Sequence, residues 1–109
     1  MRHQWASIHE LARIGLFAAL PGETLGKLAE RMERVELGPG GQVDLGPDEA
    51  LFVLGGLVGA TAPGQPSRTL QAGAWLARDA RIRAITPATV VRCSRADCEA
   101  ELGPLPESR

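Results

Sequence analysis

Short alternating segments, separated by glycine and proline, fill the middle of this 109-residue chain. Nine of the thirteen glycines lie between Gly38 and Gly73, so no uninterrupted run there is long enough for a substantial helix. Polar and apolar residues alternate within several segments, which is the period of a half-buried strand. Short strands at this spacing predict a β-sandwich or β-barrel. The predicted strands cover residues 34–37, 42–45, 50–54, 57–61, 68–71, 80–85 and 89–93.

Helical patterns flank this region on both sides. Ser7–Glu10 fits a capping box for a first helix, which Gly15 is expected to end. Pro21 suits the first position of a second helix, whose apolar residues recur at helical spacing up to Met32. Ser94 is a candidate cap for a short last helix that Gly103 stops. The class predicted is α+β, mainly β, in one domain: a helical lead-in (1–33), a small jelly-roll or β-barrel (34–93) and a short C-terminal helix (94–103).

The numbers of acidic and basic residues are nearly equal, which limits the kinds of molecule that the chain is expected to bind. The formal net charge is −1, and the densest basic stretch, Arg78 to Arg83, has the pattern of a solvated strand face. We therefore expect no nucleic-acid partner. The uncharged stretch 50–67 contains glycines and prolines and is a poor membrane helix, so no membrane insertion is expected. The first residues do not resemble a signal peptide, which makes the cytoplasm the expected compartment. Cys93 and Cys98 are expected to be reduced there, with a disulfide between them as the less favoured alternative.

Residues capable of catalysis or metal binding are scattered. His3 and His9 lie six residues apart and do not share a helical face, so they are poor co-ligands for a metal. Asp44, Asp48 and Glu49 surround a turn, but their spacing fits no calcium loop. Neither serine hydroxyls nor cysteine thiols have a predicted activating partner. We expect no catalytic residue, no metal site and no cofactor.

Five segments together resemble the cyclic nucleotide-binding domain family, the cAMP-receptor type of jelly roll. The similarity extends from about Leu11 to Leu102, and each segment alone is only a weak signal. Their order and spacing are what imply the jelly-roll fold. The segments that carry the resemblance are Leu16-Phe17-x-x-Leu20, Leu37 to Val43, Leu51 to Val58, Leu70 to Gly73 and Arg83 to Asp97.

The resemblance fails where the family keeps its phosphate-binding cassette. In the family a glycine, an aromatic residue, a Gly-Glu pair and a one-turn helix precede an arginine. Here Gly73 is separated from Arg78 by only Ala74-Trp75-Leu76-Ala77, with no acidic residue. Gly73 and Arg78 are thus the candidate remnants of a ligand site. We expect no cAMP or cGMP binding, because an arginine without a cradle of backbone N–H groups cannot orient a nucleotide.

Trp75 lies inside this shortened join and has two interpretations. Its indole either plugs the cavity that a nucleotide would fill, or is exposed as an anchor for a partner protein, a common role of tryptophan in interfaces. The resemblance and its failure together predict a non-catalytic interaction, scaffolding or regulatory module, acting with a protein partner or as a homodimer. The alternative is a sensor of a different small anionic ligand through a rearranged pocket that includes Arg78. A regulatory domain cut from a longer protein also remains open.

Overall fold

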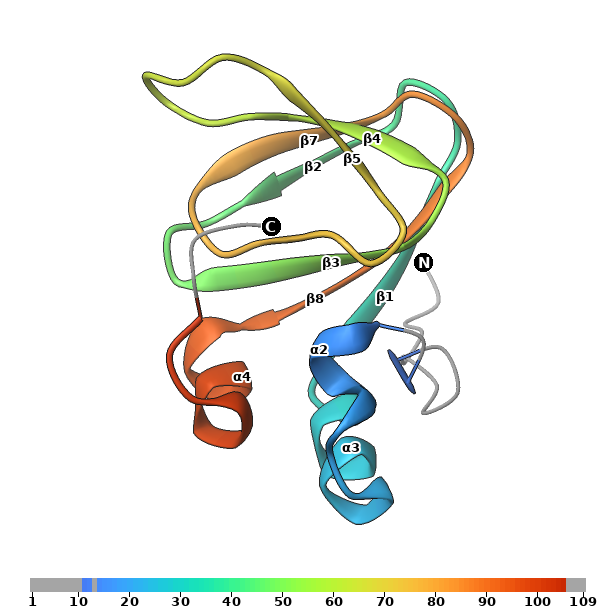
Figure 1. Cartoon of the computed structure of the whole chain (residues 1–109). Coiled ribbons are helices and arrows are strands. Elements are labelled where there is room, and N and C mark those ends of the chain that lie inside the picture. The colour runs from blue at the N-terminus through green and yellow to red at the C-terminus, as the bar shows by residue number, and fades with distance from the viewer. Residues whose placement is uncertain (1–10, 13, 106–109) are drawn as a thin grey trace.

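Two four-stranded antiparallel sheets pack face to face in the computed structural model, which describes residues 11–12 and 14–105 (Figure 1). Sheet A has the strand order β1–β8–β3–β6 and sheet B the order β2–β7–β4–β5. This is the predicted mainly β, jelly-roll-like class. The strands are β1 (Glu33–Leu37), β2 (Gln42–Leu45), β3 (Glu49–Gly55), β4 (Leu57–Thr61), β5 (Arg68–Gln71), β6 (Trp75–Leu76), β7 (Ala80–Ala84) and β8 (Ala88–Ser94).

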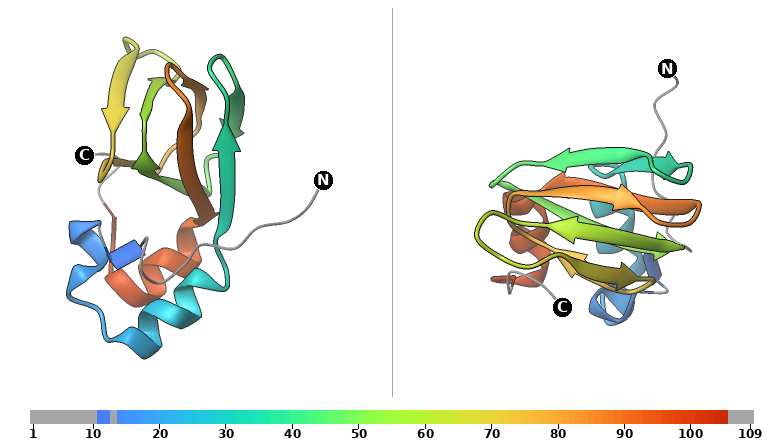
Figure 2. Two further views of the ribbon diagram at one scale, coloured as in Figure 1. Left: turned by 90° about the vertical axis from the view of Figure 1, so that its right-hand side faces the viewer. Right: turned by 90° about the horizontal axis from the view of Figure 1, so that it is seen from above.

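Apolar side chains form two cores, one on each face of sheet A. In β3, Leu51 and Val53 face sheet B, whereas Ala50 and Phe52 face the helices. The continuous apolar run predicted as a central strand is explained by this arrangement, because a strand covered on both faces has no polar side. Figure 2 shows the consequence: the helices lie together under sheet A, and no helix of the described residues covers the outer face of sheet B.

The helices are α2 (Gly15–Ala18), α3 (Gly22–Ala29) and α4 (Arg95–Leu102). The apolar face predicted for α3 is confirmed, since Leu25, Leu28 and Ala29 are buried. The predicted capping box at 7–10 lies outside the described residues. Gly15 begins α2 instead of ending a first helix, and Pro21 is the N-cap of α3, one position before its first helical residue.

The ends of α4 are fixed by different groups from those expected. Ser94 is the N-cap residue, but its side chain makes no capping hydrogen bond. The Arg95 N–H instead donates to the Asp48 carbonyl at 2.8 Å, so the turn before β3 satisfies this helix end. Gly103 terminates the helix as predicted, with φ of 78°. The helix start is therefore tied to sheet A through the backbone of a distant turn.

Candidate functional site

The join between β5 and β7 is the region where the family resemblance fails, and it is a tight crossover between the sheets. Gly73 makes the turn, with φ of 93°, a left-handed conformation that glycine adopts without a steric penalty. Its N–H donates to the Val53 carbonyl at 2.9 Å, and the Ala74 N–H donates to the Gln71 carbonyl at 3.0 Å. The N–H groups of Gly73 and Ala74 therefore hold the crossover together instead of pointing into a ligand site.

The next residues of the join, Trp75 and Leu76, form the short strand β6. Trp75 pairs with Phe52 and Leu76 with Leu51, so this backbone is the edge strand of sheet A. Successive side chains of a strand point to opposite faces. The Trp75 indole accordingly joins the helix-side core and Leu76 joins the core between the sheets.

Trp75 is 4% exposed, so the interpretation of an exposed partner anchor is wrong. The burial required by the plug interpretation is present, but on the helix side of sheet A. Leu76, at 2% exposed, belongs to the core between the sheets, against which Ala74 also packs. The sequence 74–77 has no alternating pattern, and the face of each side chain is set by the register with β3.

Arg78 follows directly and lines a small cavity at the end of the inter-sheet space. The cavity has a volume of about 40 Å³. Arg78 is half-buried, and Arg68 of β5 lies on the same cavity. Among the described residues around it, none carries a carboxylate; they are Ala60, Ala62, Gln65, Pro66, Arg68, Leu76 and Arg78. Sequence reasoning missed Arg68, because a single arginine in a short exposed strand gives no signal of its own.

Gly73 and Arg78 line two different cavities among those formed by the described residues. Gly73 borders an open groove beside β5, whereas Arg78 borders the small cavity between the sheets. Arg81 and Arg83 lie exposed on β7, as predicted for a solvated strand face, and Arg81 pairs with Asp44 of β2 at 3.2 Å. Arg78 is thus the one member of this arginine-rich stretch that lines the cavity.

The acidic turn before β3 has a structural role. The Glu49 carboxylate accepts the Gly46 N–H at 2.8 Å, which closes the turn. Within residues 11–12 and 14–105, no three side chains of the metal-ligating types gather into a site. His3 and His9 fall outside these residues. No helix of the described chain is long and apolar enough to cross a membrane.

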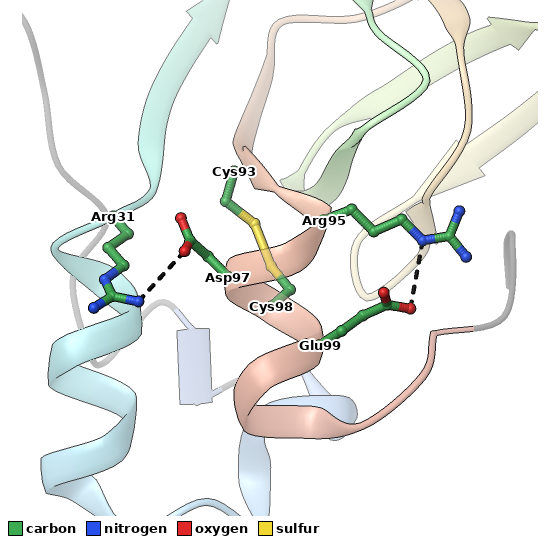
Figure 3. Close-up of a disulfide and its surroundings, with 6 residues drawn as sticks. All are labelled: Arg31, Cys93, Arg95, Asp97, Cys98 and Glu99. Atoms are coloured by element: carbon green, nitrogen blue, oxygen red, sulfur yellow. Dashed lines mark hydrogen bonds and ion pairs between the residues drawn. A yellow bond between two sulfur atoms is a disulfide. The ribbon is translucent and has the colours of Figure 1, made fainter.

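Cys93 and Cys98 form a disulfide, so the expectation of reduced thiols is wrong (Figure 3). Cys93 lies near the end of β8 and Cys98 on α4, and both belong to the helix-side core. The turn from strand into helix brings the two side chains to one face, which their separation in sequence does not reveal. A second tie runs from Arg31, after α3, to Asp97 of α4 at 3.4 Å.

Arg95 connects the join to the segment after α4. Its guanidinium donates to the Ala77 carbonyl at 3.0 Å and to the Leu105 carbonyl at 3.3 Å, and it pairs with Glu99 at 3.4 Å. The Glu99 carboxylate also accepts the Leu105 N–H at 2.8 Å. This hydrogen bond from the Leu105 backbone, together with Arg95, lowers the pKa of Glu99. The charged form of Glu99 therefore stabilises the contact between α4 and Leu105.

Solved structures similar to this chain are cyclic nucleotide-binding domains and their relatives. The regulatory domain of Toxoplasma gondii PKA, solved with cAMP, has a TM-score of 0.68 and 20% identity over 88% of this chain and 44% of that one. A cyclic nucleotide-binding-like protein from Brucella abortus has a TM-score of 0.60 and 24% identity, covering 89% and 97%. The sensor domain of the transcriptional regulator DNR from Pseudomonas aeruginosa has a TM-score of 0.67 and 19% identity, covering 86% and 75%.

The similarity is one of fold. This chain spans less than half of the length of the Toxoplasma gondii chain, but nearly all of the Brucella abortus protein. Neither a scan against protein-family models nor a search of curated proteins finds a match. The resemblance seen in the sequence motifs is confirmed at the level of three-dimensional structure.

Proposed function

We propose that this chain, which has the fold of a cyclic nucleotide-binding domain, is a non-catalytic regulatory module that acts through a protein partner and does not bind cAMP or cGMP. One observation carries the proposal: the cavity beside Arg78 has a volume of only about 40 Å³. Pockets for small organic ligands usually have volumes of ~300–1,000 Å³. A nucleotide would have to displace Leu76 and separate the sheets in order to enter.

The backbone of the join supports the same proposal. Anion sites of this type depend on several N–H groups that converge on the charged ligand. Here the N–H groups of Gly73 and Ala74 donate to carbonyls of the protein, and Trp75 and Leu76 belong to a strand. Arg78 would be left to bind a cyclic phosphate without backbone donors from Gly73 or Ala74.

Titration with cAMP and cGMP tests the proposal, and we expect no saturable change in melting temperature. A ligand present at 100 times its Kd stabilises the folded state by about 2.7 kcal/mol. For a domain of this size, such stabilisation would raise the melting temperature by roughly ten degrees or more. The matched control is 5′-AMP at equal ionic strength. A saturable shift with either cyclic nucleotide, but not with 5′-AMP, would overturn the proposal.

A second function, sensing of a compact anion, is favoured by the pairing of Arg68 and Arg78 on one cavity. A cavity of about 40 Å³ is far smaller than a pocket for a drug-sized ligand, so it suits only a compact anion of a few atoms. The guanidinium groups of Arg68 and Arg78 both line this cavity and carry the charge that an anion complements.

Inorganic phosphate is the probe for this second function. If it operates, phosphate stabilises the chain relative to chloride at equal ionic strength, and Arg78→Ala removes most of that stabilisation. Arg83→Ala, at an exposed position of β7, is the charge-matched control and keeps it. Equal responses of the two variants would exclude the cavity as the anion site.

A further inference from the structure

Of the eight residues of α4, only Cys98 is buried. The helix α3 has the same length, but it buries Leu25, Leu28 and Ala29. A helix of this length is marginal in water on its own and depends on packing for its stability. Packing of α4 therefore relies on Cys98, whereas α3 shares this role among three side chains.

Among the described residues, the other ties of α4 lie at its ends or on its exposed side. Arg95, its first residue, is hydrogen-bonded to the crossover and to the turn before β3. At the other end, Leu102 is partly buried and Leu105 is buried. The ion pair of Arg31 with Asp97 joins side chains that are 57% and 38% exposed, and such pairs contribute little to stability. The middle of α4 is thus attached to sheet A mainly through the disulfide.

The disulfide closes a short loop, so its loss is expected to act locally (Figure 3). Cys93 and Cys98 are separated by five residues in sequence, and the stabilisation that a disulfide gives the whole domain grows with the length of the loop it closes. Neither cysteine belongs to the core between the sheets. We therefore expect reduction to loosen α4 and the segment after it, while the sheets and α3 stay folded.

We propose that Cys93 and Cys98 form a reversible redox latch on α4, opened by a dithiol reductant and closed by a small-molecule disulfide. A thiolate of the reductant attacks one sulfur of the pair, which gives a mixed disulfide and releases the other cysteine as a thiolate. The second thiol of the reductant then displaces the remaining cysteine and closes a disulfide within the reductant. Two electrons and two protons pass to the protein, which ends with two thiols. Closing is the reverse exchange, in which the small-molecule disulfide is reduced to thiols.

Burial of the pair couples this exchange to movement of the helix. Cys98 is 0% exposed and Cys93 is 5% exposed, so a thiolate reaches them only when α4 moves away from sheet A. The neighbouring cysteine, held close by, would reverse a mixed disulfide with a monothiol. A dithiol completes the exchange instead, because its second thiol is also held close. The reduced chain has no covalent tie at this point, so its last helix opens more often.

Limited proteolysis of the full chain with a glutamate-specific protease tests the latch. Glu99 and Glu101 lie on α4 and Glu23 lies on α3, so one digest compares the two helices. We expect dithiothreitol to accelerate cleavage after Glu99 and Glu101 at least tenfold and to leave cleavage after Glu23 within twofold, because cleavage follows the population of the open form. Oxidised glutathione is then expected to restore the slow rate. Thiol titration of the denatured chain establishes the redox state of each sample.

Two variants locate the effect. The double variant Cys93→Ala with Cys98→Ala is expected to be cleaved rapidly on α4 with and without dithiothreitol. Asp97→Asn, which removes the charge that pairs with Arg31, keeps the tenfold response.

Three results would overturn the latch: an unchanged or irreversible rate in the wild-type chain, an equal acceleration at Glu23, or a dithiothreitol response in the cysteine-free variant. The wild-type comparison needs no variant to fold. The latch goes beyond the proposed function, since binding of a cyclic nucleotide would overturn that function and leave the latch intact.

Discussion

Replacing Gly56 with alanine is expected to cost the fold more than about 4 kcal/mol, at the upper end of what single substitutions do. Gly56 makes the turn between β3 and β4 with φ of 79°. A Cβ there would lie 2.8 Å from the Ala88 Cα and closer still to the Pro87 carbonyl oxygen. Both are backbone atoms, so no side chain can move aside. Urea denaturation followed by circular dichroism measures the loss.

Gly64→Ala is the matched control for this prediction. Gly64 has a similar φ of 73°, but a Cβ added there meets nothing within 4 Å. Its cost is therefore conformational alone, about 1–2 kcal/mol. The difference between the two variants isolates the close approach of the β3–β4 turn to residues 87–88. Equal losses would contradict that approach.

Phe52→Ala is expected to reduce the free energy of unfolding by about 3–5 kcal/mol. Phe52 is fully buried on the helix side of sheet A, and its ring lies 4.8 Å from that of Phe17, centre to centre. The loss is a large share of the total, since domains are stable by about 5–15 kcal/mol. Because Phe17 belongs to α2, the substitution also loosens the packing of this helix on sheet A.

Phe52→Leu serves as the control, because it keeps most of the buried volume and gives up chiefly the ring contact with Phe17. We expect it to lose less than half as much stability as Phe52→Ala in the same denaturation experiment. A cost below about 1 kcal/mol for Phe52→Ala, the size of an ordinary substitution, would show that α2 does not depend on this side chain.

Every described strand except β6 could be placed along the chain, because each of the others has a local signal in the sequence. Alternation in 80–85 and the apolar run in 50–54 both reflect burial, which the sequence records directly. The two-residue β6 could not be predicted, because its register with β3 alone defines it. The disulfide was missed for a related reason: Cys93 and Cys98 meet only once β8 turns into α4.

Less of the candidate site than of the fold could be predicted. Arg78 was singled out by its position after the shortened join, and it does line a cavity. Arg68 was not, because its proximity to Arg78 depends on how sheet B meets the join. The edge position of β5 had no signal either, because which strand ends a sheet is a property of the topology. The sequence shows which side chains are present, but it does not show where the backbone N–H and C=O groups point.

The Arg95 guanidinium is a mechanical coupling between two parts of the chain that are distant in sequence. It donates hydrogen bonds to the carbonyls of both Ala77 and Leu105, so a displacement of one carbonyl affects the position of the other. Movement of the chain where it crosses between the sheets would therefore disturb the hydrogen bond that holds the segment after α4. Through Arg95, the position of the crossover is coupled to the position of the segment after α4.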